Sequence, residues 1–144
     1  MKKILCALLL SLLLILAPIL LAADEAKEVK EAKHVWLTKH PTIARMLELQ
    51  NKERVRNGLR PLMLNTELCI LAQRHACWMA DTGWYVHSNM GIPEIIHSGP
   101  RTPEDAVNGW IWSPAHHWVM LSGNEAGCGY MVRNGVTYWV TLVK

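Results

Sequence analysis

The chain has 144 residues, with seven tryptophans, no phenylalanine, and 15 lysines and arginines against 12 aspartates and glutamates. Removing an N-terminal segment that contains two of the lysines would lower the formal charge from +3 to +1, which is too balanced for an electrostatic nucleic-acid binder. The roughly 120 residues that remain suffice for one domain with its own core, and not for two.

The N-terminus has the pattern of a secretory signal. Two lysines precede an apolar run over residues 4–23 that ends in small residues. Residues 1–23 are therefore predicted to be a signal peptide, with an uncleaved membrane anchor as the alternative because the run is long enough to span a bilayer. Either way the sequence predicts a secreted, periplasmic or cell-envelope protein. Residues 24–39 alternate in charge and are interpreted as a polar tether or a loosely docked helix.

Three cysteines lie beyond the signal segment, Cys69, Cys77 and Cys128. Cys69 and Cys77 are predicted on one helix, about 12 Å apart, and a disulfide spans at most about 7 Å between Cα atoms. Cys128 is left to pair with one of them, or all three are buried thiols, which is the favoured interpretation. The odd number argues against a disulfide framework.

A first helix is predicted to begin at Pro41 and to end at Asn57, because apolar residues recur at i, i+3 and i+4 and a glycine follows. The same stripe turns polar at Gln50, Asn51 and Arg54. A core-facing stripe that turns polar predicts buried hydrogen bonds to neighbouring elements.

A second helix is predicted from an N-cap at Asn65 or Thr66 to Gly83. His75 lies on its apolar face and is interpreted as a structural histidine bonded to a neighbouring backbone or side chain. Residues 84–93 follow as a loop, and residues 94–96 as a short strand.

Two further helices are predicted to start in the same way, with Thr102 before Pro103 and Ser113 before Pro114 as capping pairs. Three tryptophans fall in this stretch, at positions 110, 112 and 118. We expect at least two of them to pack the helices, so that the region buries much of the aromatic area.

The C-terminal part reads as a β-hairpin. Residues 127–132 and 136–143 form the two arms, and Asn134-Gly135 between them is a strong hairpin signal because both residues tolerate positive φ. Helices first and a terminal hairpin, with a short strand between, predict a layered α+β domain over residues 40–144.

Several short motifs occur in a fixed order along residues 41–143. They are Asn51-x-x-Arg54 with Gly58-Leu59-x-Pro61-Leu62, Asn65-x-x-Leu68, His75-Ala76-x-x-Met79, His87-Ser88, Glu94-Ile95, Thr102-Pro103-Glu104-Asp105 with Trp110, Ser113-Pro114-Ala115-His116, Gly127-Cys128-Gly129 and Tyr138-Trp139-Val140. In this order they resemble the CAP superfamily (cysteine-rich secretory proteins, antigen five and pathogenesis-related proteins) in its bacterial SCP-domain form. The resemblance implies an exported three-layer α-β-α sandwich with a central antiparallel sheet.

Members of the CAP superfamily gather two histidines and two glutamates in a large cleft. By motif position, His87 resembles the first histidine, Glu94 the first glutamate and His116 the second histidine, while Ser113 stands in place of the second glutamate. The resemblance implies a ligand-binding cleft at these four residues, and a divalent cation such as zinc held by the two histidines and the glutamate. Alternatively, these groups only hydrogen-bond one another. His117 points about 100° away from His116 and cannot easily share its ion.

Two functions are predicted. The first is a secreted, non-catalytic binding module whose cleft takes a lipid, a sterol or a peptide, and which can also act at a membrane or envelope surface. The alternative is a hydrolase that pairs Ser88 or Ser113 with one of the cleft histidines. Binding is favoured because the sequence has no GxSxG elbow and no glycine-rich oxyanion loop.

Overall fold

The computed structural model describes residues 34–144, so the predicted signal segment and most of the predicted tether lie outside the described residues. Residues 34–39 are helical and bury Leu37 in the core. This end of the segment therefore matches the docked-helix alternative. Within residues 34–144, no helix combines the length and the apolar character needed to cross a bilayer.

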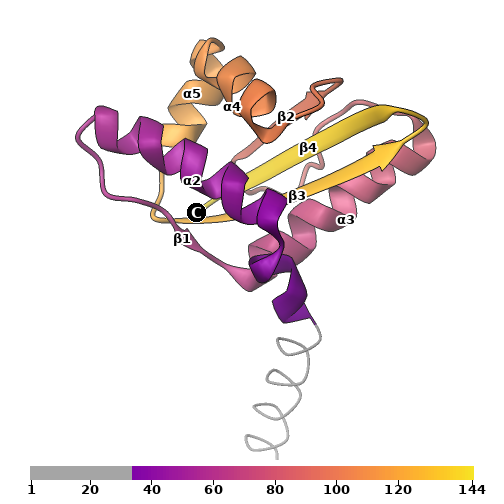
Figure 1. Ribbon diagram of the computed structural model, residues 1–144, viewed down its shortest axis with the longest axis horizontal. Helices are drawn as coiled ribbons and strands as arrows, with labels where there is room; N and C mark the ends of the chain where they lie inside the picture. The colour runs from indigo at the N-terminus through magenta and orange to yellow at the C-terminus, as the bar shows by residue number, and fades with distance from the viewer. Residues whose placement is uncertain (1–33) are drawn as a thin grey trace, which may run out of the picture. The chain divides into compact units, whose positions relative to one another are not determined.

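Four strands form one sheet in the order β1-β3-β4-β2 (Figure 1). The elements in chain order are α2 (Pro41–Arg56), β1 (Met63–Leu64), α3 (Thr66–Thr82), β2 (Glu94–Ser98), α4 (Pro103–Ile111), α5 (Pro114–Leu121), β3 (Glu125–Arg133) and β4 (Val136–Val143). Strand β4 pairs antiparallel with both β2 and β3, while the two-residue β1 pairs parallel with the start of β3. The predicted antiparallel sheet is thus confirmed, with one short parallel addition.

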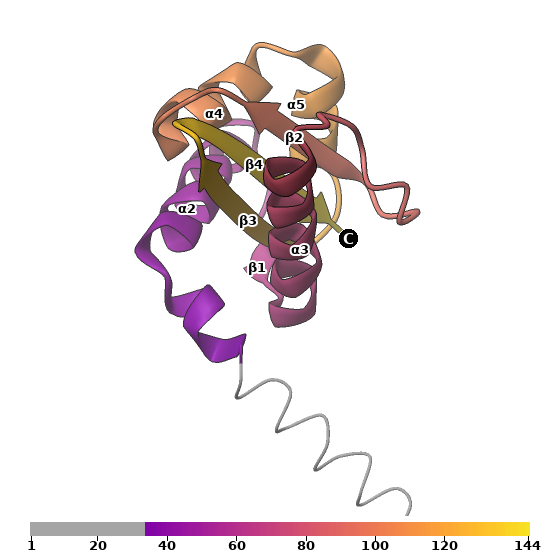
Figure 2. The same cartoon turned by 90° about the vertical axis from the view of Figure 1, so that its right-hand side faces the viewer.

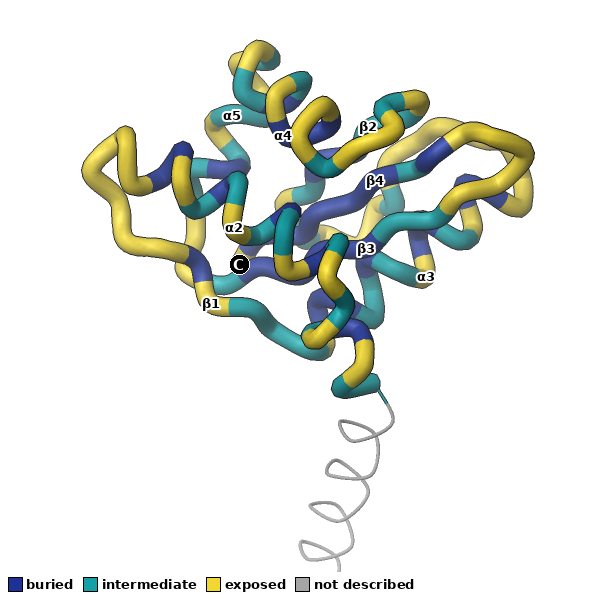
Figure 3. Tube along the Cα trace, viewed as in Figure 1, coloured by how far each residue is buried: buried dark blue, intermediate teal, exposed yellow. Residues whose placement is uncertain are grey.

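Helices cover both faces of the sheet. Figure 2 shows α3 on one face and the three helices α2, α4 and α5 on the other. Each interface has its own apolar core: Val140 and Leu142 of β4 pack toward α3, whereas Trp139 packs among residues of α2, α4 and α5. Figure 3 shows β4 dark blue along most of its length and the tip of the hairpin yellow. The predicted three-layer α-β-α sandwich is confirmed.

The glycines of β3 allow α3 to lie directly on the sheet. A Cβ atom on Gly127 would overlap the backbone of Leu68 and Cys69, and one on Gly129 would overlap the backbone of Ala72 and Gln73. A side chain at either position would therefore force the helix away from the strand. The Gly-Cys-Gly motif thus has a packing reason in this fold.

The polar stripe of α2 makes the buried hydrogen bonds that the sequence predicts. Gln50 Nε2 donates to Thr141 Oγ1 of β4 at 3.2 Å, and Asn51 bonds both the N–H and the C=O of Leu62. Arg54 donates to four backbone carbonyls. These bonds join α2 to the sheet, to the segment before β1 and to the end of α5.

Two of the three predicted side-chain caps are present. Asn65 Oδ1 accepts from the N–H of Leu68 at 3.1 Å, and Thr102 Oγ1 accepts from the N–H of Asp105 at 3.1 Å. Ser113 precedes α5 as predicted, but its side chain makes no capping hydrogen bond. In the hairpin turn, both Asn134 and Gly135 have positive φ, of 52° and 77°, as the sequence requires.

The tryptophan prediction is wrong. Trp110 is 1 % exposed, but Trp112 and Trp118 are 81 % and 70 % exposed. The helical repeat explains the difference, since residues two apart differ by about 200° around the axis. Trp110 donates its Nε1–H to the backbone oxygen of Ile96 at 2.9 Å, so Trp112 points away. Met120 faces the core, and Trp118 therefore faces out.

The three cysteines within residues 34–144 are free thiols, as favoured, although only two of them are fully buried. Cys69 and Cys128 are buried, whereas Cys77 is half-buried. Burial raises the pKa of Cys69 to about 11 and that of Cys128 to about 12. Neither buried thiol is therefore ionised at neutral pH.

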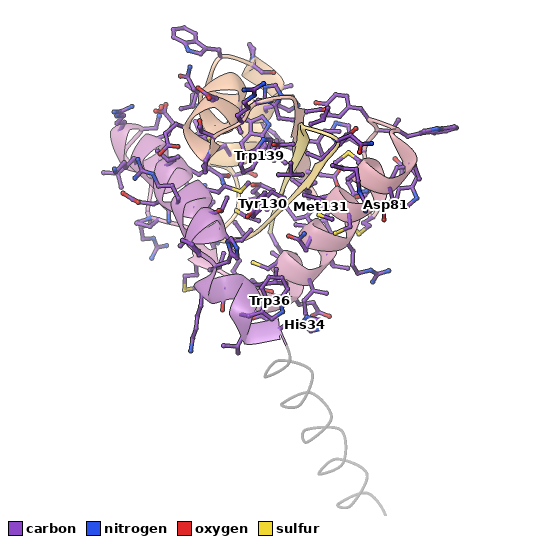
Figure 4. All side chains as sticks on the ribbon, turned by 45° about the vertical axis from the view of Figure 1, so that its right-hand side comes forward. His34, Trp36, Asp81, Tyr130, Met131 and Trp139 are labelled. Carbon is purple, nitrogen blue, oxygen red and sulfur yellow. The ribbon has the colours of Figure 1, made fainter. Side chains whose placement is uncertain are left out.

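Two aromatic rings stack on the face of the sheet that α2 covers. The rings of Tyr130 and Trp139 stack with their centroids 5.3 Å apart (Figure 4), and Trp139 Nε1–H donates to the backbone oxygen of Pro100 at 2.8 Å. The tyrosine ring also contacts His40, which lies just before α2. The two tryptophans that are almost fully buried, at positions 110 and 139, thus both use their N–H groups.

Candidate functional site

His87 and Glu94 contact each other where the 83–93 loop meets β2. His87 Nδ1 lies 2.8 Å from Glu94 Oε1, and the N–H of Ser88 donates to the same oxygen at 2.9 Å. The glutamate side chain is 5 % exposed and the histidine side chain 52 % exposed. A buried carboxylate thus holds an imidazole at the surface, where it can meet a ligand.

This cluster has unused hydrogen-bonding capacity. Among residues 34–144, three buried side-chain oxygens have no hydrogen-bond partner, and two of them are Ser88 Oγ and Glu94 Oε2. The third, Gln50 Oε1, lies in the core. Buried polar groups in folded proteins are nearly always paired, with protein, water or ligand. The two oxygens, in residues that contact each other through a hydrogen bond, thus leave capacity that a bound water or a ligand group can fill.

His116 lies near this pair, but within residues 34–144 no hydrogen bond joins it to His87 or Glu94. Burial lowers the pKa of His116, and the positive charges of His87 and His97 lower it further. His97 is a histidine that the sequence analysis missed, because the predicted strand stopped at residue 96. It packs under α4, where a Cβ atom on Gly109 would overlap its ring.

The adjacent His117 serves a different element, as the predicted 100° between the two side chains requires. Its Nε2 lies 3.0 Å from Glu53 Oε1 of α2, which also accepts from Asn57 Nδ2 at 2.9 Å. Burial raises the pKa of Glu53, but the hydrogen bonds from Asn57 and His117 and the nearby positive charges outweigh it, and the net pKa is lowered. The contact between His117 and Glu53 was not predicted, because the two residues are 64 positions apart and no local pattern joins them.

An open groove of about 950 Å³ runs along the outward face of α3 beneath the 83–93 loop. Its apolar walls include Leu71, Trp78, Trp84, Val86 and Met90, and its polar lining includes His87 and Ser88. Figure 4 labels Asp81, another lining residue, on α3. Glu94, Ser113 and His116 do not line this groove, so His87 and Ser88 are its link to the predicted cleft.

The loop that roofs the groove is pinned at successive residues. Tyr85 donates its hydroxyl hydrogen to the backbone oxygen of Ile96 at 3.1 Å, and the backbone oxygen of Val86 lies 2.8 Å from His75 Nε2. The His75 ring also stacks on Trp78 at 5.7 Å. The structural role predicted for His75 is thus confirmed.

The present arrangement does not suit a metal ion. Within the described residues, no three His, Cys, Asp or Glu side chains are grouped as a metal site requires. His87 and Glu94, two of the predicted ligands, bond each other. A cation at His87, Glu94 and His116 therefore requires the cluster to rearrange, and the zinc site stays a prediction.

The predicted nucleophiles lack a base in this arrangement. Ser88 Oγ is buried without a hydrogen-bond partner in the described part of the chain, and Ser113 makes no capping bond. Nucleophilic catalysis by serine needs an imidazole within hydrogen-bond reach of the hydroxyl. The hydrolase alternative stays a prediction, and no contact found in residues 34–144 favours it.

The sequence pattern of the cysteine-rich secretory protein family, abbreviated CAP, matches residues 47–143. The chain belongs to this family. The matched span takes in every element from the C-terminal part of α2 to β4, including both histidines and the glutamate of the predicted cleft.

Two bacterial proteins that match this chain are distant from it in sequence. An uncharacterised Bacillus subtilis protein, YkwD, is 29 % identical over 106 residues, which is 60 % of this chain and 41 % of the relative. An extracellular Bacillus anthracis protein with an SCP domain superposes with a TM-score of 0.60 at 18 % identity, over 72 % of this chain and 40 % of that one. This chain thus spans about two fifths of the length of each.

Two further solved structures share the fold over most of their own length. An outer surface protein of Borrelia burgdorferi has a TM-score of 0.57 at 18 % identity, covering 78 % of this chain and 90 % of that one. Venom allergen-like protein 4 of Schistosoma mansoni has a TM-score of 0.56 at 18 % identity, covering 71 % and 86 %. At such identities the likeness concerns the fold alone.

Proposed function

We propose that this CAP protein is an exported, non-catalytic binding module whose groove takes an apolar or amphiphilic ligand, namely a lipid, a sterol or an apolar peptide. The observation that carries the proposal is the position of His87. It lines the apolar groove along α3 and is bonded to the buried carboxylate of Glu94, which has an orphaned oxygen. Mostly apolar walls with a few fixed polar groups are typical of ligand pockets.

Export is supported by the N-terminal pattern of lysines followed by an apolar run. Two structural neighbours are consistent with export, since one is an extracellular protein and the other an outer surface protein. Mass spectrometry of the protein recovered from culture medium and from the cell envelope tests this step. Retention of Met1 in all recovered protein would contradict signal-peptide cleavage.

The polar end of the groove sets the orientation of the ligand. His87 is half-exposed and held by Glu94, so one imidazole nitrogen remains to meet a polar head, and Ser88 Oγ lies in the next residue. The hydrocarbon part of the ligand then lies along Leu71 and Trp78 of α3. A ligand with no polar atom would leave the half-exposed imidazole of His87 without a partner and bind more weakly.

Binding is tested with two fluorescent probes, cis-parinaric acid for a fatty acid and dehydroergosterol for a sterol. Tryptophan emission from Trp78 and Trp84 should fall and probe emission should rise as energy is transferred, because both rings line the groove. Leu71→Trp should weaken binding by filling the groove from the helix side. The matched control Val55→Trp adds the same side chain at an exposed position on α2. Equal probe affinity in both variants would contradict the groove as the site.

A further inference from the structure

Residues 84–90, here called the aromatic loop, present large apolar side chains to solvent. Trp84 is 67 % exposed, and Tyr85, Val86 and Met90 are also exposed. Trp78 of α3 is exposed beside them and lines the same groove as Trp84, Val86 and Met90. Trp78, Trp84, Val86 and Met90 thus form an apolar patch along one groove. Apolar patches on a protein surface mark interaction sites.

The exposure is fixed by the fold. Three successive residues of the loop are tied to two elements: Tyr85 to Ile96 of β2, Val86 to His75 of α3, and His87 to Glu94 at the start of β2. The loop is therefore held in a conformation that keeps Trp84 outward. A preorganised apolar surface loses little conformational entropy when it meets a partner.

A positively charged side chain lies beside the patch. Arg74 lies one helical turn before Trp78 and lines the same groove. Its guanidinium is exposed, and within residues 34–144 it forms no ion pair or hydrogen bond with any side chain. The one carboxylate in the groove lining, Asp81, is paired with Arg133. The patch thus combines free positive charge with aromatic side chains.

We propose that the aromatic loop docks this protein on the surface of an anionic phospholipid bilayer, with Trp84 and Met90 in the interfacial region and Arg74 on the headgroups. This inference rests on the proposed function and names the surface from which the groove takes its ligand. Tryptophan suits the headgroup level because its ring is apolar and its N–H is polar. The unpaired arginine supplies the attraction for anionic lipid.

The experiment uses the full chain with vesicles of phosphatidylcholine alone, or of phosphatidylcholine mixed with phosphatidylglycerol, carrying brominated acyl chains that quench tryptophan emission on contact. We expect quenching to increase with phosphatidylglycerol. Trp84→Ala should remove most of this increase. Arg74→Gln should lower the docking constant about fivefold on the mixed vesicles, and leave it unchanged on phosphatidylcholine.

Trp112→Ala is the matched control, because Trp112 is even more exposed, at 81 %, and lies outside the groove. It should leave the quenching by brominated lipid intact. Equal losses in the Trp84 and Trp112 variants, or equal quenching on both vesicle types, would overturn the proposal. So would a dimer that Trp84→Ala disperses without any lipid quenching, since a second copy would then be the occupant.

Failure of the docking and failure of the proposed function give different results. If parinaric acid and dehydroergosterol bind but brominated lipids do not quench, docking alone is wrong. If quenching occurs and Leu71→Trp leaves probe binding unchanged, the ligand groove is wrong and the docking surface remains.

Discussion

Two buried polar clusters of this CAP domain differ in how completely they are satisfied. In the first, the guanidinium of Arg54 donates to the backbone oxygens of Arg60, Met120, Ser122 and Gly123. In the second, the carboxylate of Glu94 accepts twice through one oxygen and leaves the other without a partner. Both side chains are almost fully buried.

The difference separates a closed cluster from an open one, and the open cluster lies at the end of the groove where we propose that a ligand binds. The Arg54 cluster is closed, since carbonyls at the ends of several elements receive one rigid donor, and nothing is left to bind. The Glu94 cluster is open, because its remaining capacity points to a partner from outside the chain. Burial alone does not distinguish them; the hydrogen-bond count does.

Two adjacent histidines show the same contrast between a residue that holds the fold together and a residue near the open cluster. Glu53, beside Arg54 in the sequence, bonds His117 and so holds α5 against α2. His116, the preceding residue, lies close enough to His87 and His97 for their positive charges to lower its pKa, after the larger effect of burial. One pair of adjacent histidines therefore serves both the scaffold and the site, and the scaffold contact fixes the helix that carries His116.

The largest effect is expected from Arg54→Met. The substitution removes a buried guanidinium and leaves four backbone carbonyls without this donor, and we expect the free energy of unfolding to fall by about 3–5 kcal/mol. Arg54→Lys should lose less, because one ammonium can still reach some of these oxygens. Urea unfolding followed by circular dichroism measures both. A loss below about 1 kcal/mol for the methionine variant would show that the cluster is not the anchor described here.

The next effect concerns Glu53 and depends on pH. Glu53→Gln weakens the bond to His117, and we expect a loss of about 1–2 kcal/mol at neutral pH. Because the folded-state pKa of Glu53 is below its ordinary value of 4.5, the stabilisation is fully present above that value and is lost as the pH falls through the lowered pKa. Wild type and variant should therefore converge in acid. A constant difference at every pH would show that the charge of Glu53 does not contribute.

Much of this fold could be predicted from the sequence because the patterns that specify it are local. The hairpin turn at Asn134-Gly135 and the caps at Asn65 and Thr102 depend on neighbours within four residues, and all were predicted correctly. The polar stripe on α2 also followed from spacing alone. What the spacing did not reveal was the partner of each polar group, such as the carbonyls that Arg54 binds.

The errors arose where the answer depends on which face of a short helix meets the sheet. Trp110 and Trp112 are alike in sequence context, but only one of them can face the core when two residues turn the helix by about 200°. His97 was missed for a similar reason, since its side chain reaches α4 only if the strand continues to residue 98. The groove along α3 was not foreseen because its walls come from a loop whose path no local pattern specifies.

A smaller effect on stability is expected at the open cluster. Glu94→Gln keeps one oxygen to accept from His87 and Ser88, and removes a buried charge. We expect the free energy of unfolding to change by less than about 1 kcal/mol. The affinity for cis-parinaric acid should nevertheless fall, because His87 is no longer oriented by a carboxylate. A loss of stability as large as that of Arg54→Met would place Glu94 in the scaffold and remove the contrast between the two clusters.

The smallest effect is expected from zinc, measured by isothermal titration on the wild type and on His116→Ala. The family resemblance predicts a zinc-binding heat that this variant abolishes. The geometry favours small and equal heats, because His87 and Glu94 bond each other and no third ligand is grouped with them in the described part of the chain. A heat that disappears in His116→Ala but persists in His117→Ala would show that the open cluster rearranges around a cation. The orphaned oxygen of Glu94 would then be a metal ligand, and the contrast with Arg54 would be one between a closed anchor and a metal-binding site.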